Sequence, residues 1–300
     1  MLLQDILAGL TFLAVALVSG NNLSACFGPS IGSRTVSQRS GALLGGLGFC
    51  LGLLVQGSTM VISAHALLPE ATPQLESEAL LVSILVFIAA YFIRVPIPLT
   101  MSLVGLLAGL ATARSMPISN TYIERVVIMW FAAPLVAMVS AFFLIRVIDR
   151  GQPKDVWRRL QTYKILLILL SFASAYVLGA NTLGLLVATG GFDESTLIVV
   201  FPAILAGSFF LSAGEVRRVS QEFFLMRYPN AMVALTTSTV LVEVATILGI
   251  PLSNTQALSA AVLGTGISYK NRLISLKPFA IIAAGWIVAP LASYGLGLIL

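Results

Sequence analysis

Long stretches without a charged residue constrain this chain more than any other feature. Runs that lack Asp, Glu, Lys and Arg cover residues 6–33, 40–69, 79–93, 95–113, 126–145, 165–192, 195–214, 228–242, 244–269 and 278–300. A helix that spans a bilayer needs about 17–25 mostly apolar residues. Several runs fit one such helix, and the longer ones contain Gly, Asn, Pro or Ser near their middle. We therefore expect an all-α polytopic membrane protein with broken or re-entrant helices at the midplane.

The composition agrees with a membrane protein and excludes several other classes. Hydrophobic residues make up 58% of the chain and charged residues 10%, whereas a soluble domain carries about a quarter charged residues. This argues against a soluble enzyme, a disordered tail and a disulfide scaffold. Two cysteines and one histidine are too few for a protein-held zinc, haem or iron–sulfur centre. The small net charge of +5 argues against nucleic-acid binding, so we expect neither a metal nor a nucleic-acid partner.

The positions of the basic residues predict an orientation. If residues 1–147 and 163–300 each cross the bilayer five times, all Lys and Arg residues except Arg114 and Arg125 fall on one side. An excess of basic residues marks the cytoplasmic side. The predicted organisation is a first transmembrane repeat (1–147), a cytoplasmic linker (148–162) and a second transmembrane repeat (163–300). We expect a multi-pass protein of the cell membrane with both termini extracytoplasmic.

The two halves of the chain share three motifs in the same order. The spacing between copies is nearly constant, with offsets of 159, 155 and 156 residues. The pairs are Gly20-Asn21-Asn22 with Gly179-Ala180-Asn181, Pro96 to Gly109 with Pro251 to Gly264, and Trp130 to Leu135 with Trp286 to Leu291. An odd number of crossings per half turns the second copy upside down relative to the first. Inverted repeats with interruptions at matching positions are typical of secondary transporters.

Two segments resemble the start of a half-helix. The segment from Pro251 to Gln256 combines a proline with Ser, Asn and Thr, which are good N-caps, and an apolar run follows it. The segment from Pro98 to Ser102 can do the same in the first half. A helix N-terminus presents free backbone N–H groups and a partial positive charge, and both favour an anion. The candidate substrate-binding residues are Asn22, Thr100, Ser102, Asn181, Ser253, Asn254, Thr255 and Gln256.

Polar residues within apolar runs are candidates for coupling transport to a cation. Asn carbonyls can coordinate Na⁺, and Glu243 is the only carboxylate well inside an apolar run, so it can carry a proton. The candidates are Asn21, Asn22, Asn181, Thr182 and Glu243. In the alternative reading, the Asn residues cap broken helices or bond across helices. Glu243 would then be a structural residue that faces Thr236, Thr239 or Thr246.

Two segments also resemble a known family. The stretch from Gly20 to Arg34 is similar to the Gly-Ala-Asn-Asp signature of the inorganic phosphate transporter (PiT) family, which likewise ends in Gly-x-x-x-Gly-Ser-Arg. The stretch from Pro251 to Gly264 resembles the family's Pro-Val-Ser-Thr-Thr-His-Ala segment, and Trp286 to Pro290 fits its last helix. The resemblance implies an inverted-repeat symporter that carries inorganic phosphate, or sulfate in some branches, together with Na⁺ or H⁺. It also implies a homodimer and an anion site near the midplane.

The chain departs from the family pattern at the motif positions. Leu23 and Thr182 replace the signature Asp, and Met101 and Gln256 replace the His. The expected function is cation-coupled symport of inorganic phosphate or a similar oxyanion, with no cofactor other than Na⁺ or H⁺. A sulfate or other small-oxyanion permease and an uncoupled anion channel remain alternatives. An intramembrane enzyme would need a cluster of acids, bases or metal ligands, so we do not expect an enzyme.

Overall fold

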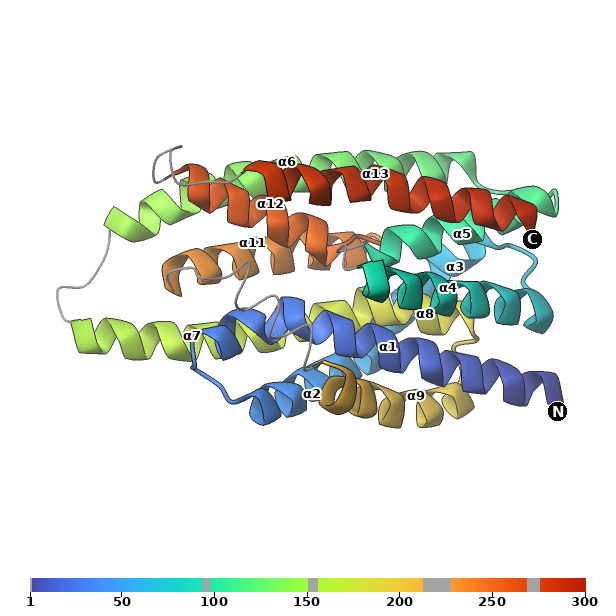
Figure 1. The fold of residues 1–300 in the computed structure, drawn as a ribbon, viewed down its shortest axis with the longest axis horizontal. Coiled ribbons are helices and arrows are strands. Elements are labelled where there is room, and N and C mark those ends of the chain that lie inside the picture. The colour runs from blue at the N-terminus through green and yellow to red at the C-terminus, as the bar shows by residue number, and fades with distance from the viewer. Residues whose placement is uncertain (1, 94–97, 151–155, 213–227, 269–275) are drawn as a thin grey trace.

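The chain folds into a long bundle of helices. In the computed structural model, residues 2–93, 98–150, 156–212, 228–268 and 276–300 are described, and every regular element in these ranges is a helix (Figure 1). The first half contains α1 (Leu2–Gly32), α2 (Gln38–Gln56), η1 (Gly57–Met60), α3 (Val61–Leu67), α4 (Pro73–Ile93), α5 (Leu99–Ala113) and α6 (Asn120–Arg150). The second half contains α7 (Val156–Leu178), η2 (Gly179–Leu183), α8 (Gly184–Thr189), α9 (Glu194–Ala206), η3 (Gly207–Leu211), α11 (Tyr228–Ile247), α12 (Asn254–Ile267) and α13 (Leu276–Ile299).

Seven helices in the described ranges are long and apolar enough to cross a membrane. They are Leu3–Gly32, Gln38–Leu67, Asn120–Arg150, Trp157–Thr189, Glu194–Leu211, Tyr228–Ile247 and Ile282–Ile299. Large apolar side chains such as Val147, Ile198 and Phe210 remain exposed on their outer faces. A soluble protein would bury such side chains, whereas lipid accommodates them. The chain is therefore a multi-pass membrane protein, as predicted.

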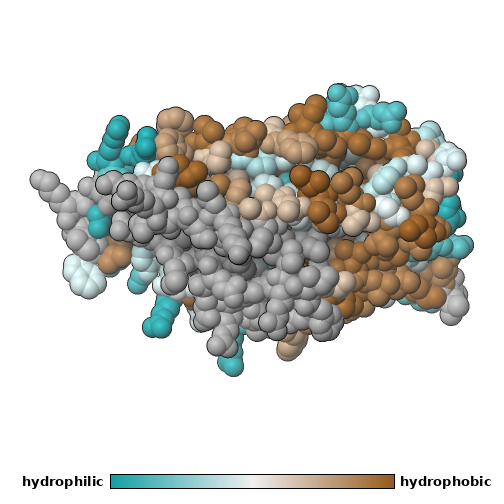
Figure 2. Space-filling model, turned by 45° about the horizontal axis from the view of Figure 1, so that its top comes forward, coloured by the Kyte–Doolittle hydropathy of each residue, from teal (hydrophilic) through white to brown (hydrophobic). Residues whose placement is uncertain are grey.

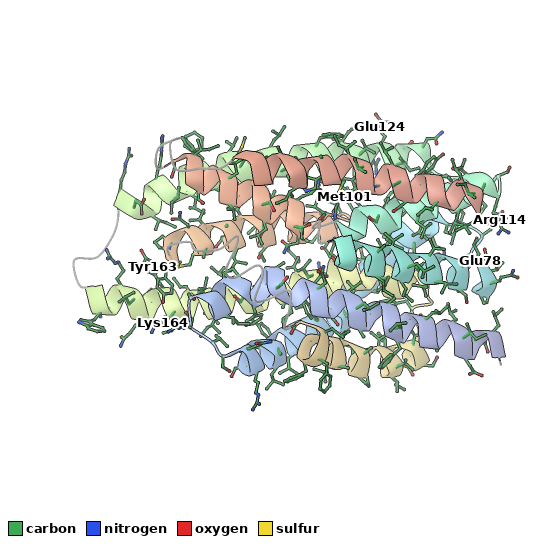
Figure 3. All side chains as sticks on the ribbon, in the orientation of Figure 1. Glu78, Met101, Arg114, Glu124, Tyr163 and Lys164 are labelled. Carbon is green, nitrogen blue, oxygen red and sulfur yellow. The ribbon has the colours of Figure 1, made fainter. Side chains whose placement is uncertain are left out.

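Charge and hydropathy are distributed along the bundle as a bilayer requires. Where Figure 2 shows described residues, hydrophobic atoms extend along the upper part and the right-hand half of the visible face, and hydrophilic atoms gather mainly towards the two ends. Glu78 and Arg114 lie at the end that holds both chain termini, Glu124 lies in the same half of the bundle, and Tyr163 and Lys164 lie towards the opposite end (Figure 3). Arg114 pairs with Glu78 at 3.1 Å. Polar groups at both ends are expected where a helical bundle meets the headgroups.

Helices of one half pack against helices of the other. α5 lies along α13, and α12 lies along α6, while α1 contacts α9 and α2 contacts α7. The motif offsets align α5 with α12 and α6 with α13, so each short helix packs on the last helix of the opposite half. α5 and α12 start near the middle of the bundle and run towards opposite ends, and α6 and α13 are also antiparallel (Figure 1).

Glycines allow several of these helices to touch backbone to backbone. A Cβ on Gly109 would collide with the carbonyl oxygen of Tyr294, and one on Gly264 would collide with that of Met138. The motif offsets align Gly109 with Gly264 and Tyr294 with Met138. Close packing through small residues is the usual way for helices to associate in a membrane.

The expected break at Asn22 is wrong. α1 is a single helix from Leu2 to Gly32 and contains both Asn22 and Pro29. Asn costs a helix less than about 0.7 kcal/mol relative to Ala, and packing of this helix against its neighbours outweighs that cost. Gly20 serves close packing rather than a break, since a Cβ there would lie 2.9 Å from the carbonyl oxygen of Gly207.

At Asn181, where a break was expected, the helix is distorted but continues. Residues Gly179–Leu183 form a turn of π-helix between α7 and α8, so the helix widens there without stopping. A π-turn inserts one extra residue into the hydrogen-bond ladder and is common at functional sites. The run 244–269, in contrast, is interrupted: α11 ends at Ile247 and α12 begins at Asn254.

The predicted linker 148–162 is largely helical where it is described. Ile148 to Arg150 complete α6, and Val156 to Thr162 belong to α7. Residues 151–155 lie outside the described ranges, as do residues 94–97, which include Pro96 of the first-half motif.

Candidate functional site

Two short helices begin in the interior of the bundle. α5 starts after Pro98 and α12 starts after Ser253, as the two proline-containing segments predict. Met101, in the first turn of α5, lies near the middle of the bundle (Figure 3). Thr100 is 4% exposed and Asn254 is also 4% exposed, so both helix starts are buried. A buried helix start is unusual because its first N–H groups need partners outside the helix.

Neither helix start is capped by a side chain of the described residues. Pro98 has no group that can cap α5, and Ser253 makes no capping bond to α12. The Ser253 hydroxyl instead pairs with the Thr255 hydroxyl at 2.8 Å. The first backbone donors within these turns are Ser102, to the Pro98 carbonyl, and Ala257, to the Ser253 carbonyl. The N–H groups before them are therefore the ones that remain to receive an anion.

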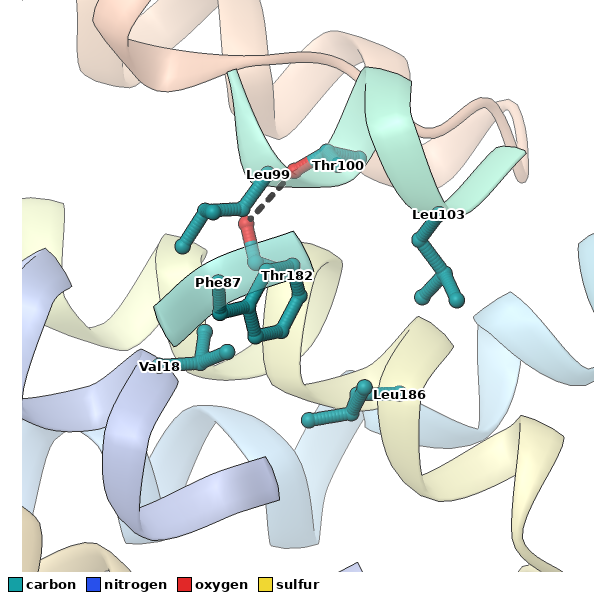
Figure 4. Close-up of a pocket in the computed structure, with 7 residues that line it drawn as sticks. All are labelled: Val18, Phe87, Leu99, Thr100, Leu103, Thr182 and Leu186. Atoms are coloured by element: carbon teal, nitrogen blue, oxygen red, sulfur yellow. Dashed lines mark hydrogen bonds between the residues drawn. The ribbon is translucent and has the colours of Figure 1, made fainter. Parts of the chain in front are cut away.

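Residues of the π-turn η2 contact both the segment before α12 and the first turn of α5. The Asn181 amide nitrogen donates to the Thr246 hydroxyl and to the Ile250 carbonyl, both at 3.0 Å. Its carbonyl accepts from the Leu252 N–H at 3.1 Å. The next residue, Thr182, places its hydroxyl 3.4 Å from that of Thr100 (Figure 4). Two consecutive residues of η2 therefore connect the lead-in of α12 with the start of α5.

A small pocket lies beside the Thr100–Thr182 contact. Its lining is apolar apart from these two hydroxyls, and it is drawn in Figure 4. The lining residues are Val18, Phe87, Leu99, Thr100, Leu103, Thr182 and Leu186. Val18 lies one turn before Asn22 on α1, so α1 forms one wall of this pocket beside the start of α5.

Several buried polar atoms near the helix starts have no hydrogen-bond partner among the residues described. They are Asn22 Nδ2, Ser102 Oγ, Gln256 Oε1 and both side-chain polar atoms of Asn254. Leaving such a group unpaired costs about 1–3 kcal/mol. The sequence prediction named all four residues as substrate contacts. Unpaired buried polar atoms of this kind are expected where a polar ligand binds.

The predicted residues differ in how far their side chains are already engaged. The Asn181 amide uses both its nitrogen and its oxygen to position residues 250–252. Asn21 is only partly buried, and its backbone carbonyl accepts from the Ser24 hydroxyl at 2.7 Å. Asn181 thus positions the lead-in to α12, whereas Asn22 and Asn254 keep unpaired atoms.

Glu243 lies in a polar network that joins three helices. Its Oε1 accepts from the Gln56 amide at 3.0 Å, and the Gln56 side-chain carbonyl accepts from the Tyr176 hydroxyl at 3.2 Å. Its Oε2 is buried without a partner within the described ranges. In the alternative reading, Glu243 is a structural residue that faces Thr236, Thr239 or Thr246, but the structure gives it Gln56 of α2 as its hydrogen-bond partner. Glu243 lies one helical turn before Thr246, which contacts Asn181.

Sequence reasoning missed three residues that shape this region. Gln56 and Tyr176 complete the Glu243 network, and Trp130 donates its indole N–H to the Pro251 carbonyl at 3.0 Å. Signals were present: Gln56 is a polar residue in an apolar run, and a buried indole N–H usually finds a partner. The partner helix, however, could not be read from the sequence. Among the described residues, no group of three or more His, Cys, Asp or Glu could hold a metal ion.

Comparison with known proteins agrees with this architecture. The model of the phosphate transporter family matches residues 18–297. A protein of Methanocaldococcus jannaschii named "Putative phosphate permease" is 25% identical over 297 residues, which cover 97% of this chain and 94% of that protein. A solved structure named "The sodium-dependent phosphate transporter" has the same fold, with a TM-score of 0.85, 16% identity and full coverage of both chains. The family match spans nearly the whole sequence, and the chain therefore belongs to the phosphate transporter family.

Proposed function

We propose that the protein is a secondary active transporter that moves inorganic phosphate across the cell membrane by cation-coupled symport. The observation that carries this proposal is the pair of buried, uncapped helix starts at α5 and α12. Free N–H groups and helix dipoles at both starts offer a dehydrated anion the hydrogen bonds that water would otherwise supply. The names of the two relatives support phosphate as the anion.

In this proposal the anion lies between the two helix starts. Thr100 and Ser102 of α5 bind it, and so does Asn22 of α1. On α12, Ser253, Asn254, Thr255 and Gln256 surround the helix end that carries the partial positive charge. The unpaired atoms of Asn22, Ser102, Asn254 and Gln256 support this placement. Asn181 and Thr182 position the two starts relative to each other.

Alternating access follows from the way in which the two halves pack. We propose that residues 1–147 and 163–300 are inverted repeats that rock against each other around the anion. The reciprocal contacts of α5 with α13 and of α12 with α6 support this proposal, as do the opposite directions of the paired helices (Figure 1). Inverted repeats supply inward-open and outward-open states by exchanging the conformations of the two halves.

The coupling cation has two candidate positions. A proton can bind Glu243, whose buried Oε2 has no partner among the residues described. Alternatively, Na⁺ can bind near Asn21, Asn22, Asn181 and Thr182. The name of the structural relative states sodium dependence, which supports this second position. Thr246 lies one helical turn after Glu243 and bonds to Asn181, which also bonds to residues 250 and 252 before α12. A proton on Glu243 can therefore influence the anion site through these contacts.

Reconstitution of the purified protein into liposomes tests the function. Labelled phosphate uptake is measured under a Na⁺ gradient, a proton gradient and neither. We expect saturable uptake that one of the two gradients drives uphill. A large ohmic phosphate current without saturation would contradict the symport mechanism and favour a channel. Uptake of labelled sulfate in place of phosphate would identify the protein as a sulfate permease.

A further inference from the structure

The start of α12 presents unpaired hydrogen-bond acceptors as well as donors. Asn254 is 4% exposed, and neither its Nδ2 nor its Oδ1 has a partner in the described part of the chain. Gln256 is 1% exposed, and its Oε1 is likewise unpaired there. An anion site needs donors. Buried acceptors beside it need a donor, and a ligand that carries an O–H group can supply one.

The presence of free acceptors does not depend on how the amides are oriented. Turning the Asn254 amide exchanges its oxygen and nitrogen, but one donor and one acceptor remain unpaired in either orientation. The Gln256 nitrogen faces the Trp130 carbonyl at 3.5 Å. Turning that amide would bring two carbonyl oxygens together, so the acceptor is the atom left free.

The start of α5 offers no equivalent side-chain amides. The offset of 155 residues aligns Asn254 with Leu99 and Gln256 with Met101, neither of which has an amide. The two helix starts are therefore chemically different: both supply backbone N–H groups, but only the start of α12 adds amide oxygens. This asymmetry gives the site one face that can distinguish a hydroxyl on the ligand from a bare anionic oxygen.

We propose that Asn254 and Gln256 select for oxyanions that carry a proton. The inference rests on the proposed function, because it requires the anion to bind at the start of α12. At neutral pH every inorganic phosphate ion carries at least one O–H group, and arsenate resembles it, whereas sulfate carries none. The O–H group of phosphate donates to an amide oxygen. Sulfate would instead place an anionic oxygen against that amide oxygen and leave it unpaired.

The expected discrimination is large. Sites built to bond a ligand hydroxyl can reject an analogue that lacks it by about 10⁴-fold, and one lost hydrogen bond to a charged group alone accounts for about 10–100-fold. We therefore expect sulfate to compete with phosphate at least about 100-fold more weakly than arsenate does.

Competition binding to the purified protein tests this inference. Labelled phosphate is displaced at neutral pH by unlabelled phosphate, arsenate or sulfate. Asn254→Ser replaces the amide with a hydroxyl that can turn its proton towards the anion, and Gln256→Met introduces the residue found at the matching position of the first half. We expect either variant to bind sulfate at least about 10-fold more tightly relative to phosphate. Asn230→Ser, which changes another buried amide with an unpaired oxygen at the start of α11, should leave the ratio unchanged.

The outcomes separate the inference from the function on which it rests. Absence of phosphate binding by the unmodified protein overturns the proposed function and the inference with it. Phosphate binding with equally tight sulfate binding overturns the inference alone. Unchanged phosphate-to-sulfate ratios in both Asn254→Ser and Gln256→Met, with phosphate still bound, also overturn it.

Discussion

Both polar atoms of the Asn181 side chain are engaged in hydrogen bonds. It is completely buried and makes three hydrogen bonds, all of them to residues of α11 or to the segment between α11 and α12. Residues 250–252 have no helix of their own to satisfy their backbone groups. The Asn181 amide supplies these partners at a depth where water cannot.

Replacement of Asn181 should therefore both destabilise and inactivate the protein. Asn181→Ala leaves the Ile250 carbonyl and the Leu252 N–H unpaired, which we expect to lower the free energy of unfolding by about 3 kcal/mol. Thermal unfolding in detergent measures this loss, and phosphate binding should disappear at temperatures where the variant is folded. Asn21→Ala is the control, because Asn21 is only partly buried. Equal stability of the two variants would contradict the role assigned to Asn181.

Glu243 gives a second prediction at the scale of single residues. If a proton on Glu243 drives transport, Glu243→Gln should still bind phosphate but should no longer accumulate it under a proton gradient. Gln keeps the size of the side chain and can still bond to Gln56, so the fold is expected to persist. Liposome uptake under imposed proton and Na⁺ gradients measures the effect. Uptake that still follows the proton gradient would exclude Glu243 as the coupling site.

At the scale of elements, backbone contacts between helices depend on particular glycines. On α13, a Cβ at Gly297 would lie 2.7 Å from the backbone nitrogen of Leu110 on α5, whereas a Cβ at Gly295 meets nothing within 4 Å. The two glycines are two residues apart on the same helix, so one serves as the control for the other.

We expect opposite effects from the two substitutions. Gly297→Ala should lower the free energy of unfolding by about 1–3 kcal/mol, since α5 must move away. Gly295→Ala should be neutral or stabilise by up to about 1 kcal/mol, because Ala favours the helix. Thermal unfolding in one detergent provides the comparison. A greater loss for Gly295→Ala would show that α5 and α13 do not pack as described.

The start of α9 gives a prediction about pH. Asp193 caps this helix by accepting from the Thr196 N–H at 2.7 Å, and this bond, with a further one from the Ser195 hydroxyl, lowers the pKa of the carboxyl. A lowered pKa in the folded state stabilises the protein above the unfolded pKa of about 3.9, and this contribution is lost as the pH falls through the folded value. Asp193→Ala should cost about 1 kcal/mol at neutral pH. The difference from the unmodified protein should shrink in unfolding experiments below about pH 4, and a constant difference would contradict the cap.

The sequence predicted the starts of two helices but neither the continuity of α1 nor the contacts between distant helices. Pro98 and Pro251 correctly marked the starts of α5 and α12, because proline removes a backbone donor and restricts the preceding residue. Thr100, Ser253, Asn254 and Gln256 after them are buried, whereas Thr255 is only partly buried. Asn22 did not break α1, since tertiary packing overrides a weak local preference. The Gln56–Glu243 contact joins residues 187 positions apart, and a separation of that size leaves no local trace in one sequence.

At the scale of the whole molecule, both termini lie at the same end of the bundle (Figure 1). The distribution of basic residues predicts that this end is extracytoplasmic. Glu194, at the start of α9, should then lie outside, and Arg39, near the start of α2, should lie inside.

Labelling of single cysteines tests this orientation. In a background with Cys26→Ala and Cys50→Ala, a membrane-impermeant thiol reagent added to intact cells should label Glu194→Cys and not Arg39→Cys. Both variants should be labelled after the cells are permeabilised. The reverse pattern would show that the protein is inserted the other way and that phosphate enters the site from the opposite side.

The central claim is that two buried helix starts from opposite halves bind one phosphate ion. A structure determined by electron cryo-microscopy with saturating phosphate tests it most directly. The account predicts density for a tetrahedral ion between the first turns of α5 and α12, within hydrogen-bonding distance of Thr100 and Asn254. Phosphate density elsewhere, with these first turns in contact with water or protein alone, would contradict it.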